Sequence, residues 1–334
     1  MQYKVGLYGG CFDPIHLGHV DCILQAAASC EELYVVLVVS QTVRQIDPRV
    51  RYRWLYELTE HIGNVKILTL NDYCKEKAEY TPEAARQDCQ YIRKTIGKPI
   101  DAVFCGSDYD KDSFWAVCYP ECAFVTFPRN EMSSTELRKD PYGHWDWIPT
   151  VARPYFVKKV LLVGGESVGK STLTISLAHR FNTNYIDEAG REISMRSGDD
   201  RLMLQSDYTE ILLRHKLNEI EALKRSNKLL FVDTDALITR FYLEFLDGGV
   251  SDQNIALADA IDAINNYDLI LFLEPDVAFV QDGGRSEEIH SDREKYSRRI
   301  KQILQEHSRN FVSISGDYQN RYKEAVRHVF ELIG

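Results

Sequence analysis

The sequence has no long apolar run. Its longest runs, residues 33–39 and 269–273, are far too short to cross a lipid bilayer, and no leader-like segment precedes the strand-like residues 4–8. Positive charge is also in deficit, because 40 Lys and Arg stand against 50 Asp and Glu, a formal net charge of −10. We therefore expect a cytoplasmic protein with no membrane insertion and no general affinity for nucleic acid.

Cysteine is absent from everything after residue 122, and no two cysteines have the C-x-x-C spacing of a zinc site. We interpret the cysteines as reduced thiols that act as small hydrophobic side chains. Their confinement to the first part of the chain favours two modules of separate origin. They are Cys11, Cys22, Cys30, Cys74, Cys89, Cys105, Cys118 and Cys122.

With 334 residues, the chain is long enough for about two domains, each with its own core. Strand-like segments such as 33–40 alternate with helix-like segments such as 48–61, which is typical of doubly wound α/β folds. Prolines and a glycine interrupt this alternation over residues 139–157. We expect two doubly wound parallel-sheet domains, residues 1–150 and 157–334.

A phosphate-binding loop opens the second half. Residues 164–172 read GGESVGKST and match G-x-x-x-x-G-K-[ST], between a strand-like and a helix-like segment. Backbone amides of such a loop form an anion site at a helix N-terminus. Lys170 would reach the β- and γ-phosphates of ATP, and Ser171 would bind Mg²⁺. The predicted ATP-binding residues here are Gly164, Gly165, Glu166, Ser167, Val168, Gly169, Ser171 and Thr172.

Acidic residues follow other strand-like segments of this half. Asp233-Thr234-Asp235 ends an apolar strand, where a carboxylate meets Mg²⁺ or an acceptor hydroxyl, although Asp235 has a helix-capping alternative. Glu188 follows another strand end. The charged segment 282–293, which contains Arg285, is either a lid over the phosphoryl group or a solvated surface loop. No N-K-x-D motif is present, which disfavours a GTPase.

The first half has its own turn at a strand end, the string H-x-G-H at residues 16–19. In an α/β sheet, ligands bind at the carboxyl ends of strands. Gly9 and Gly10 allow close approach of a phosphate to the backbone. Imidazoles at positions 16 and 19 would donate hydrogen bonds to the phosphates of a nucleotide.

The longer string GGCFDPIHLGH at residues 9–19 resembles the signature of the nucleotidyltransferase superfamily that makes NAD, coenzyme A and related dinucleotides. Residues 133–138, SSTELR, are similar to its triphosphate-binding element, with Met132 in place of the usual Ile. Residues 106–108, GSD, are similar to its adenosine-contacting element. The resemblance implies a Rossmann-like N-terminal nucleotidyltransferase domain.

This resemblance implies adenylyl transfer, in which a mononucleotide attacks the α-phosphate of ATP and pyrophosphate leaves. Positioning and charge stabilisation would carry the rate. His16, His19 and Arg138 would hold the phosphates. The implied ATP-binding residues are Gly9, Gly10, Phe12, Asp108, Ser134 and Thr135.

A nucleotidyltransferase followed directly by a P-loop kinase resembles the NadR family, which joins nicotinamide-nucleotide adenylyltransferase to ribosylnicotinamide kinase. The resemblance covers nearly the whole chain, including the loop at 164–172, DTD at 233–235 and the junction at 147–156. It implies that the C-terminal domain phosphorylates nicotinamide riboside with ATP and Mg²⁺. The N-terminal domain would then join nicotinamide mononucleotide to AMP, giving NAD.

The same resemblance implies roles at the kinase site. Lys170 and Arg285 would act on the phosphoryl group, and Ser171 and Asp233 would bind Mg²⁺. Either Asp233 or Glu188 would lie beside the acceptor hydroxyl. The implied substrate-binding residues are Arg191, Tyr208 and Asp235.

Some family members begin with a DNA-binding helix-turn-helix, whereas this sequence starts at the first strand of the adenylyltransferase, so we expect no operator binding. Two other functions stay open. One is a coenzyme A pair, phosphopantetheine adenylyltransferase with dephospho-coenzyme A kinase. The other is a kinase with a non-catalytic, nucleotide-sensing N-terminal domain. A homo-oligomer is the prior expectation for such a protein.

Overall fold

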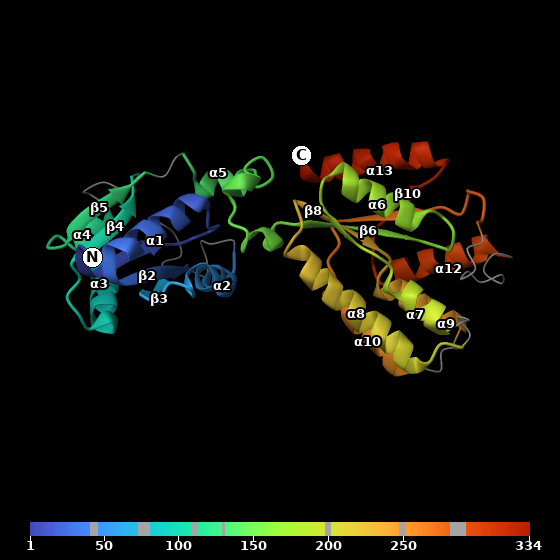
Figure 1. Cartoon of the computed structure of the whole chain (residues 1–334), viewed down its shortest axis with the longest axis horizontal. Helices are drawn as coiled ribbons and strands as arrows, with labels where there is room; N and C mark the ends of the chain where they lie inside the picture. The colour runs from blue at the N-terminus through green and yellow to red at the C-terminus, as the bar shows by residue number, and fades with distance from the viewer. Residues whose placement is uncertain are drawn as a thin grey trace. The chain divides into compact units, whose positions relative to one another are not determined.

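The computed structural model describes residues 1–40, 46–72, 81–107, 113–128, 131–197, 202–246, 252–280 and 292–334. The chain divides into two compact units, Met1–Ala152 and Arg153–Gly334, both built from alternating strands and helices (Figure 1). Within the described ranges, none of the helices has the length and apolarity that a membrane crossing requires.

The first unit contains a five-stranded parallel sheet in the order β3-β2-β1-β4-β5. The chain steps outward from β1 to β3 and then returns to place β4 on the other side of β1. The strand order therefore reverses between β1 and β4, which is where α/β sheets bind ligands. The strands are β1 (Tyr3–Gly10), β2 (Cys30–Ser40), β3 (Val65–Asp72), β4 (Ala102–Gly106) and β5 (Ala123–Phe127). The helices are α1 (Leu17–Ser29), α2 (Pro48–Thr59), α3 (Pro82–Ile96), α4 (Phe114–Cys118) and α5 (Ser134–Lys139).

The second unit repeats this architecture with the sheet order β10-β9-β6-β8-β7, all neighbours being parallel. Its strands are β6 (Lys158–Gly164), β7 (Asn184–Ile186), β8 (Leu229–Asp233), β9 (Leu269–Leu273) and β10 (Val312–Ile314). Its helices are α6 (Lys170–Arg180), α7 (Ala189–Ser197), α8 (Gln205–Leu223), α9 (Ala236–Leu246), α10 (Asp252–Ile264), α12 (Arg293–Glu306) and α13 (Tyr318–Ile333). Short 3-10 turns at Trp145–Trp147 and Arg153–Tyr155 flank the division between the units.

Local sequence explains where these elements begin and end. Every side chain of β8 is buried, because helices cover both faces of a parallel sheet and the strand is almost wholly apolar. Helix α3 begins at Pro82, and the hydroxyl of Thr81 accepts a hydrogen bond from the backbone of Ala84 at 3.2 Å. It ends at Gly97, whose φ of 65° suits a residue without a Cβ.

The second unit departs from sequence expectation along α8. Apolar residues recur along α8 at the spacing typical of a helix with one buried face, yet Leu217 and Ile220 are 61% and 44% exposed. Instead, α8 buries His215 and Glu219, and the carboxylate of Glu219 accepts a hydrogen bond from Lys159 at 2.9 Å. An ion pair satisfies the buried charge, so a polar residue occupies a position that periodicity assigns to an apolar one.

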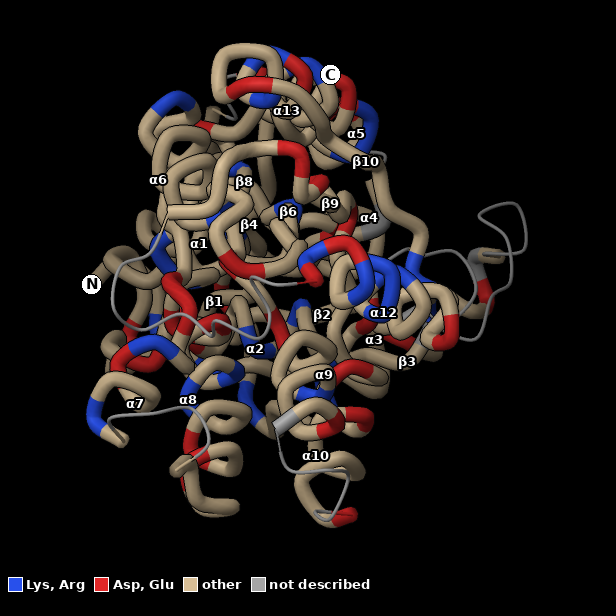
Figure 2. The backbone as a smooth tube through the Cα atoms, turned by 90° about the vertical axis from the view of Figure 1, so that its right-hand side faces the viewer, with Lys and Arg blue, Asp and Glu red and all other residues tan. Residues whose placement is uncertain are grey.

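Basic and acidic residues are interspersed along the backbone of the described elements (Figure 2). Lys and Arg alternate with Asp and Glu along individual helices, as in the pair of Arg327 with Glu331 on α13 at 2.8 Å.

We predict that Gly9→Ala destabilises the first unit by about 1–3 kcal/mol, the usual cost of overpacking a core. A Cβ at Gly9 would lie 1.9 Å from the ring of Trp115, which α4 packs against the end of β1. The matched control is Gly63→Ala, where a Cβ meets nothing within 4 Å. All four tryptophans precede residue 152, so urea unfolding followed by tryptophan fluorescence reports this unit. Equal midpoints for the two variants would contradict the prediction.

Candidate active sites

The H-x-G-H string of the first unit lies where α1 begins, just beyond the end of β1. His16 is the N-cap residue of α1, and its ring stacks on that of His19 with centroids 3.7 Å apart. Phe12 contacts the other side of this pair, with its ring centroid 5.1 Å from His19. His16 is fully buried and His19 is 5% exposed, so helix, loop and neighbouring rings fix both imidazoles.

A backbone contact identifies the tautomer of His19, which the sequence leaves open. The backbone N–H of His16 donates to Nδ1 of His19 at 3.3 Å. Because this nitrogen accepts a hydrogen bond, the neutral ring carries its proton on Nε2. The Nε2–H of His19 is therefore a donor, as contact with a phosphate oxygen requires.

The second motif of this unit docks directly on the first. The hydroxyl of Ser134 donates to the carbonyl oxygen of Pro14 at 2.9 Å, and the guanidinium of Arg138 donates to the carbonyl oxygen of Asp13. Arg138 also donates to the hydroxyl of Thr135 at 3.1 Å. Two motifs more than 100 residues apart thus form one cluster, with two histidines and an arginine near the end of β1, where Gly9 and Gly10 lie.

Asp108 is the one predicted residue of this site that lies outside the described residues. The residues before it are in place, since β4 ends at Gly106 and the backbone of Ser107 donates to the carbonyl of Phe127 at 2.8 Å. The predicted contact of Asp108 with ATP therefore stays a prediction.

Arg51 is a central residue of the first unit that sequence reasoning missed. Its side chain is fully buried, and its guanidinium donates to backbone carbonyls of Ile46 at 2.9 Å and Val38 at 3.1 Å and to that of Cys11. It thus connects the glycine-rich turn with the end of β2. In the sequence it is one of three arginines in the first turns of α2, and nothing in the spacing marks it as buried.

In the second unit, the loop between β6 and α6 has the backbone that its glycines predict. Gly164 has a φ of 151°, and a Cβ there would lie 2.7 Å from the carbonyl oxygen of Leu273. Gly169 has a φ of 87° and caps α6. The ammonium of Lys170 donates to the carbonyl of Gly165 at 2.9 Å, so the lysine folds back along its own loop. This is a loop shaped for phosphate, with the lysine beside it.

Asp233 is the last residue of β8, the strand that pairs with β6, and its carboxylate faces this loop. In the register of the sheet, Asp233 pairs with Leu162 of β6, two residues before Gly164. Burial raises its pKa to about 6, while the nearby charge of Lys170 lowers it and that of Glu188 raises it. Neither oxygen is in hydrogen-bonding geometry with a described side chain, although the hydroxyl of Ser171 is near enough to lower the pKa.

This geometry fits a hard cation. Asp233 is fully buried with two free acceptor oxygens, and a hydroxyl and a second carboxylate, those of Ser171 and Glu188, act on it from nearby. Mg²⁺ prefers oxygen ligands, and P-loop proteins commonly supply one hydroxyl and one strand-end carboxylate. The described residues include no cluster of three His, Cys, Asp or Glu, so phosphate oxygens and water would complete the coordination.

Of the remaining predicted kinase residues, Arg191 lies beside the phosphate-binding loop. It donates to the hydroxyl of Ser171 at 3.2 Å and lies 3.8 Å from the carboxylate of Glu188. Asp235 is the cap of α9, because its carboxylate accepts from the backbone of Leu237 at 3.1 Å. Burial and the nearby Asp262 raise the pKa of Asp235 to about 7.

Tyr208 is buried on α8, with 3% of its surface exposed. Arg285 lies outside the described residues, so its predicted contact with the phosphoryl group stays a prediction. Residues 282–291 of the predicted lid lie outside the described residues, and its last residue, Arg293, begins α12. The guanidinium of Arg293 donates to the carbonyl of Val277 at 2.6 Å, which connects the start of α12 to the segment after β9.

His215 is a second residue that sequence reasoning missed. It lies on the buried face of α8, where burial lowers its pKa and the carboxylates of Glu219 and Glu188 raise it. Its ring also interacts with the backbone carbonyl of Asp233. A neutral imidazole thus lies near the carboxylates of Glu188 and Glu219. A histidine in a helix far along the sequence carries no spacing signal that would reveal this position.

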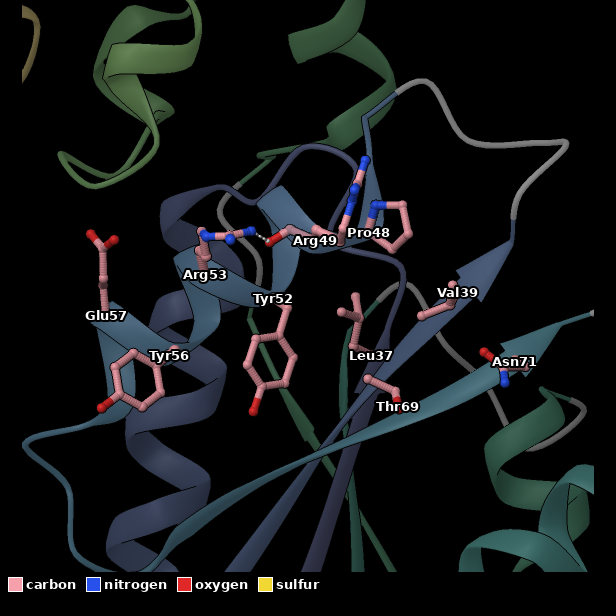
Figure 3. Close-up of a pocket in the computed structure, with 10 residues that line it drawn as sticks. All are labelled: Leu37, Val39, Pro48, Arg49, Tyr52, Arg53, Tyr56, Glu57, Thr69 and Asn71. Carbon is pink, nitrogen blue, oxygen red and sulfur yellow. Dashed lines mark hydrogen bonds between the residues drawn. The ribbon is translucent and has the colours of Figure 1, made fainter. Parts of the chain in front are cut away.

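A separate cleft of about 620 Å³ lies between α2 and the ends of β2 and β3 (Figure 3). Tyr52 and Tyr56 extend from the helix over Leu37 and Thr69 of the strands. None of the predicted site residues lines this cleft. It is a feature of the outer edge of the sheet and not of the loops that carry the motifs.

Comparisons with known proteins cover the whole chain. A cytidylyltransferase-like family model matches residues 7–140, and an AAA domain model matches residues 159–321. The trifunctional NAD biosynthesis/regulator protein NadR of Salmonella typhimurium is 29% identical over an alignment of length 349, which covers 100% of this chain and 84% of the relative. A crystal structure of a NadR protein in complex with NR has a TM-score of 0.81 at 23% identity, covering 100% and 97% of the two chains. A second, in complex with NAD and AMP-PNP, has the same score at 22% identity, covering 99% and 96%.

The fold and the two sets of motifs define a two-domain nucleotide-binding protein, in which a cytidylyltransferase-like domain precedes a P-loop domain of the AAA type. The similarity continues through both domains. The chain is similar to the NadR proteins along its whole length, which confirms the predicted resemblance. The predicted fold class is also confirmed.

We predict that Asp233→Asn stabilises the second unit at pH 8, by on the order of 2 kcal/mol, and much less at pH 4.5. The pKa of Asp233 is about 6 in the folded protein against an ordinary 3.8. A raised pKa contributes stability below 3.8 that is lost as the pH rises through 6. At pH 8 the wild type therefore carries the full cost of a buried charge, which the amide avoids.

The measurement is the unfolding free energy of the second unit at both pH values, followed by far-UV circular dichroism. Asp187→Asn is the matched control, because Asp187 is exposed beside the same site. A stabilisation by Asp233→Asn that does not grow between pH 4.5 and pH 8 would show that the carboxylate is not held in the buried state described here.

Proposed function

We propose that this chain is a bifunctional NAD salvage enzyme. The second unit phosphorylates nicotinamide riboside with ATP, and the first unit adenylylates the resulting nicotinamide mononucleotide with a second ATP to give NAD and pyrophosphate. The observation that carries the proposal is the presence in one chain of two clusters, each assembled from predicted motif residues whose chemistry suits phosphate. The full-length similarity to NadR supports it, since that relative is named for NAD biosynthesis.

In the kinase step, the amides of the loop at 164–172 bind the phosphates of ATP, and Lys170 neutralises charge on the β- and γ-phosphates. Asp233 lies at the carboxyl end of β8, where an acceptor hydroxyl reaches the γ-phosphate. Arg191 bridges Ser171 and Glu188, so it orders the acidic side of the site. Mg²⁺, bound by Ser171 and Asp233, would offset the negative charge of the phosphates.

The carboxylates of Asp233 and Glu188 have different roles in the proposed kinase step. Asp233 is fully buried, whereas the side chain of Glu188 is 26% exposed. The exposed group is the one that an incoming ribose reaches, so we infer that Glu188 orients the 5′-hydroxyl while Asp233 serves the cation. Arg285 and Tyr208 complete the proposed contacts with the phosphoryl group and the nucleoside.

In the adenylyl transfer step, His16, His19 and Arg138 surround the position of the phosphates. The Nε2–H of His19 donates to the α- or β-phosphate, and Arg138 supplies a fixed positive charge from α5. No covalent intermediate is needed, because the mononucleotide phosphate attacks the α-phosphate in line while pyrophosphate departs. The buried, stacked imidazoles offer donors that require no rearrangement when charge develops.

The proposal includes a cytoplasmic location, because both steps consume ATP, and a homo-oligomer as the default assembly. It also retains the predicted division into domains at residues 1–150 and 157–334. The coenzyme A pair is disfavoured, because the similarity to NadR extends through the second unit as well as the first.

We predict that purified protein converts nicotinamide riboside, ATP and Mg²⁺ to NAD. His19→Ala should accumulate nicotinamide mononucleotide, because the kinase still works while adenylyl transfer loses a phosphate donor. Lys170→Ala should form neither product, with riboside consumption reduced by roughly 100-fold or more, as expected when a group that stabilises developing charge is removed. Products are separated by chromatography with mass detection.

Each outcome distinguishes the candidate functions. Mononucleotide as the sole product of the wild type would mean a kinase that carries a sensing first unit. No product from the riboside would overturn the nicotinamide assignment, and phosphopantetheine with ATP would be tested next. Stabilisation of the wild type by phosphopantetheine but not by nicotinamide mononucleotide in a thermal-shift assay would confirm that change of assignment.

A further inference from the structure

A buried arginine at the start of α13 contacts three loops at the nucleotide end of the second sheet. Arg321 is only 3% exposed, although arginine is almost never buried without partners. Its Nη1 donates to the carbonyl of Val168 in the phosphate-binding loop at 2.6 Å. Its Nη2 donates to the carbonyl of Glu274 after β9 at 2.8 Å, and its Nε to the carbonyl of Gly316 after β10 at 2.7 Å.

An aspartate closes this arrangement. The carboxylate of Asp276 forms an ion pair with Arg321 through one oxygen and accepts from the backbone N–H of Gly316 at 2.6 Å through the other. Burial raises the pKa of Asp276, but the N–H of Gly316 and the charge of Arg321 hold it below its ordinary value. The carboxylate therefore stays ionised and keeps both contacts at neutral pH.

The contacts of Arg321 lie at the edge of the sheet where nucleotides bind in α/β proteins. The loops after β6, β9 and β10 all leave the carboxyl ends of adjacent parallel strands, which is the edge where α/β sheets bind nucleotides. In a phosphate-binding loop the amides turn toward the anion. A carbonyl such as that of Val168 points the other way, into the protein, and needs a buried donor.

We propose that Arg321 is a positioning residue for the ATP site of the second unit. Without touching ATP, it holds the phosphate-binding loop, the segment after β9 and the loop after β10 in one arrangement, so that ATP binds amides that are already in place. The inference rests on the proposed kinase function of this unit. A planar guanidinium meets three carbonyls and a carboxylate at once, whereas the point charge of lysine cannot reproduce that fork.

The test compares Arg321→Lys with Arg327→Lys in the full chain. Arg327 lies on the same helix, but its side chain is 56% exposed and pairs with Glu331, which makes it a matched control. The rate of riboside consumption is measured as a function of the concentration of ATP and of nicotinamide riboside. This rate reports the kinase step alone. Adenylyl transfer from added mononucleotide serves as an internal control, since it uses the other unit.

For Arg321→Lys we expect the KM for ATP to rise about tenfold, a factor that corresponds to about 1.4 kcal/mol of lost binding. We expect kcat and the KM for the riboside to change by less than about threefold, because uniform binding of ATP is what is lost. Arg327→Lys should leave all three values unchanged. Asp276→Asn, at a residue whose side chain is 41% exposed, should raise the KM for ATP in the same direction while the protein stays folded.

An unchanged KM for ATP in both Arg321→Lys and Asp276→Asn would overturn the inference. So would a parallel rise in the KM for the riboside, which indicates general loosening of the unit. If the wild type itself fails to consume riboside, the proposed function fails and not the positioning role. In that case, the test is the protection of residues 164–172 from hydrogen exchange that ATP induces, compared between wild type and Arg321→Lys. Equal protection in the two proteins would overturn the positioning role.

Discussion

The two nucleotide sites share one constraint: a loop that turns its amides toward an anion must turn its carbonyls into the protein. Water is excluded there, so each buried carbonyl needs a donor from elsewhere in the fold. In the first unit Arg51 donates to carbonyls of the glycine-rich turn and the end of β2, and in the second unit Arg321 does so for the phosphate-binding loop. Both arginines are almost completely buried, and both come from helices outside the motifs. The motifs present the ligand-binding face, while these arginines support the opposite face.

The second unit also contains a buried carboxylate, that of Asp233, whose charge its neighbours compensate only in part. Asp233 lies on a strand whose other residues are apolar, and burial disfavours its charged form. Lys170 compensates only in part, since Glu188 acts in the opposite direction. A protein that required only stability would place an apolar residue here. A cation bound as proposed here would offset that cost, so folding and ligand binding would be linked through this one group.

Much of this structure could be predicted from the sequence. The order of strands and helices in the first unit, the two-unit organisation and the loop at 164–172 follow from apolar runs, glycines and proline punctuation, which are local signals. No prediction covered α9, α10 and α12, although α12 buries Tyr296, Ile300 and Ile303 at helical spacing, which is a local signal. Arg51 and Arg321 escaped prediction for a different reason. Burial of an arginine depends on carbonyls brought near it by the fold, and sequence spacing does not encode that.

The distance along the chain between Arg321 and Val168 has a consequence for synthesis of the protein. Their hydrogen bond spans 153 residues, whereas every contact within the first unit is complete once about 150 residues have been made. The first unit is therefore able to fold while the second is still being translated. The phosphate-binding loop, by contrast, leaves the ribosome long before its buried donor does. Until α13 is made, the carbonyl of Val168 lacks its buried donor, so this loop reaches its folded arrangement last.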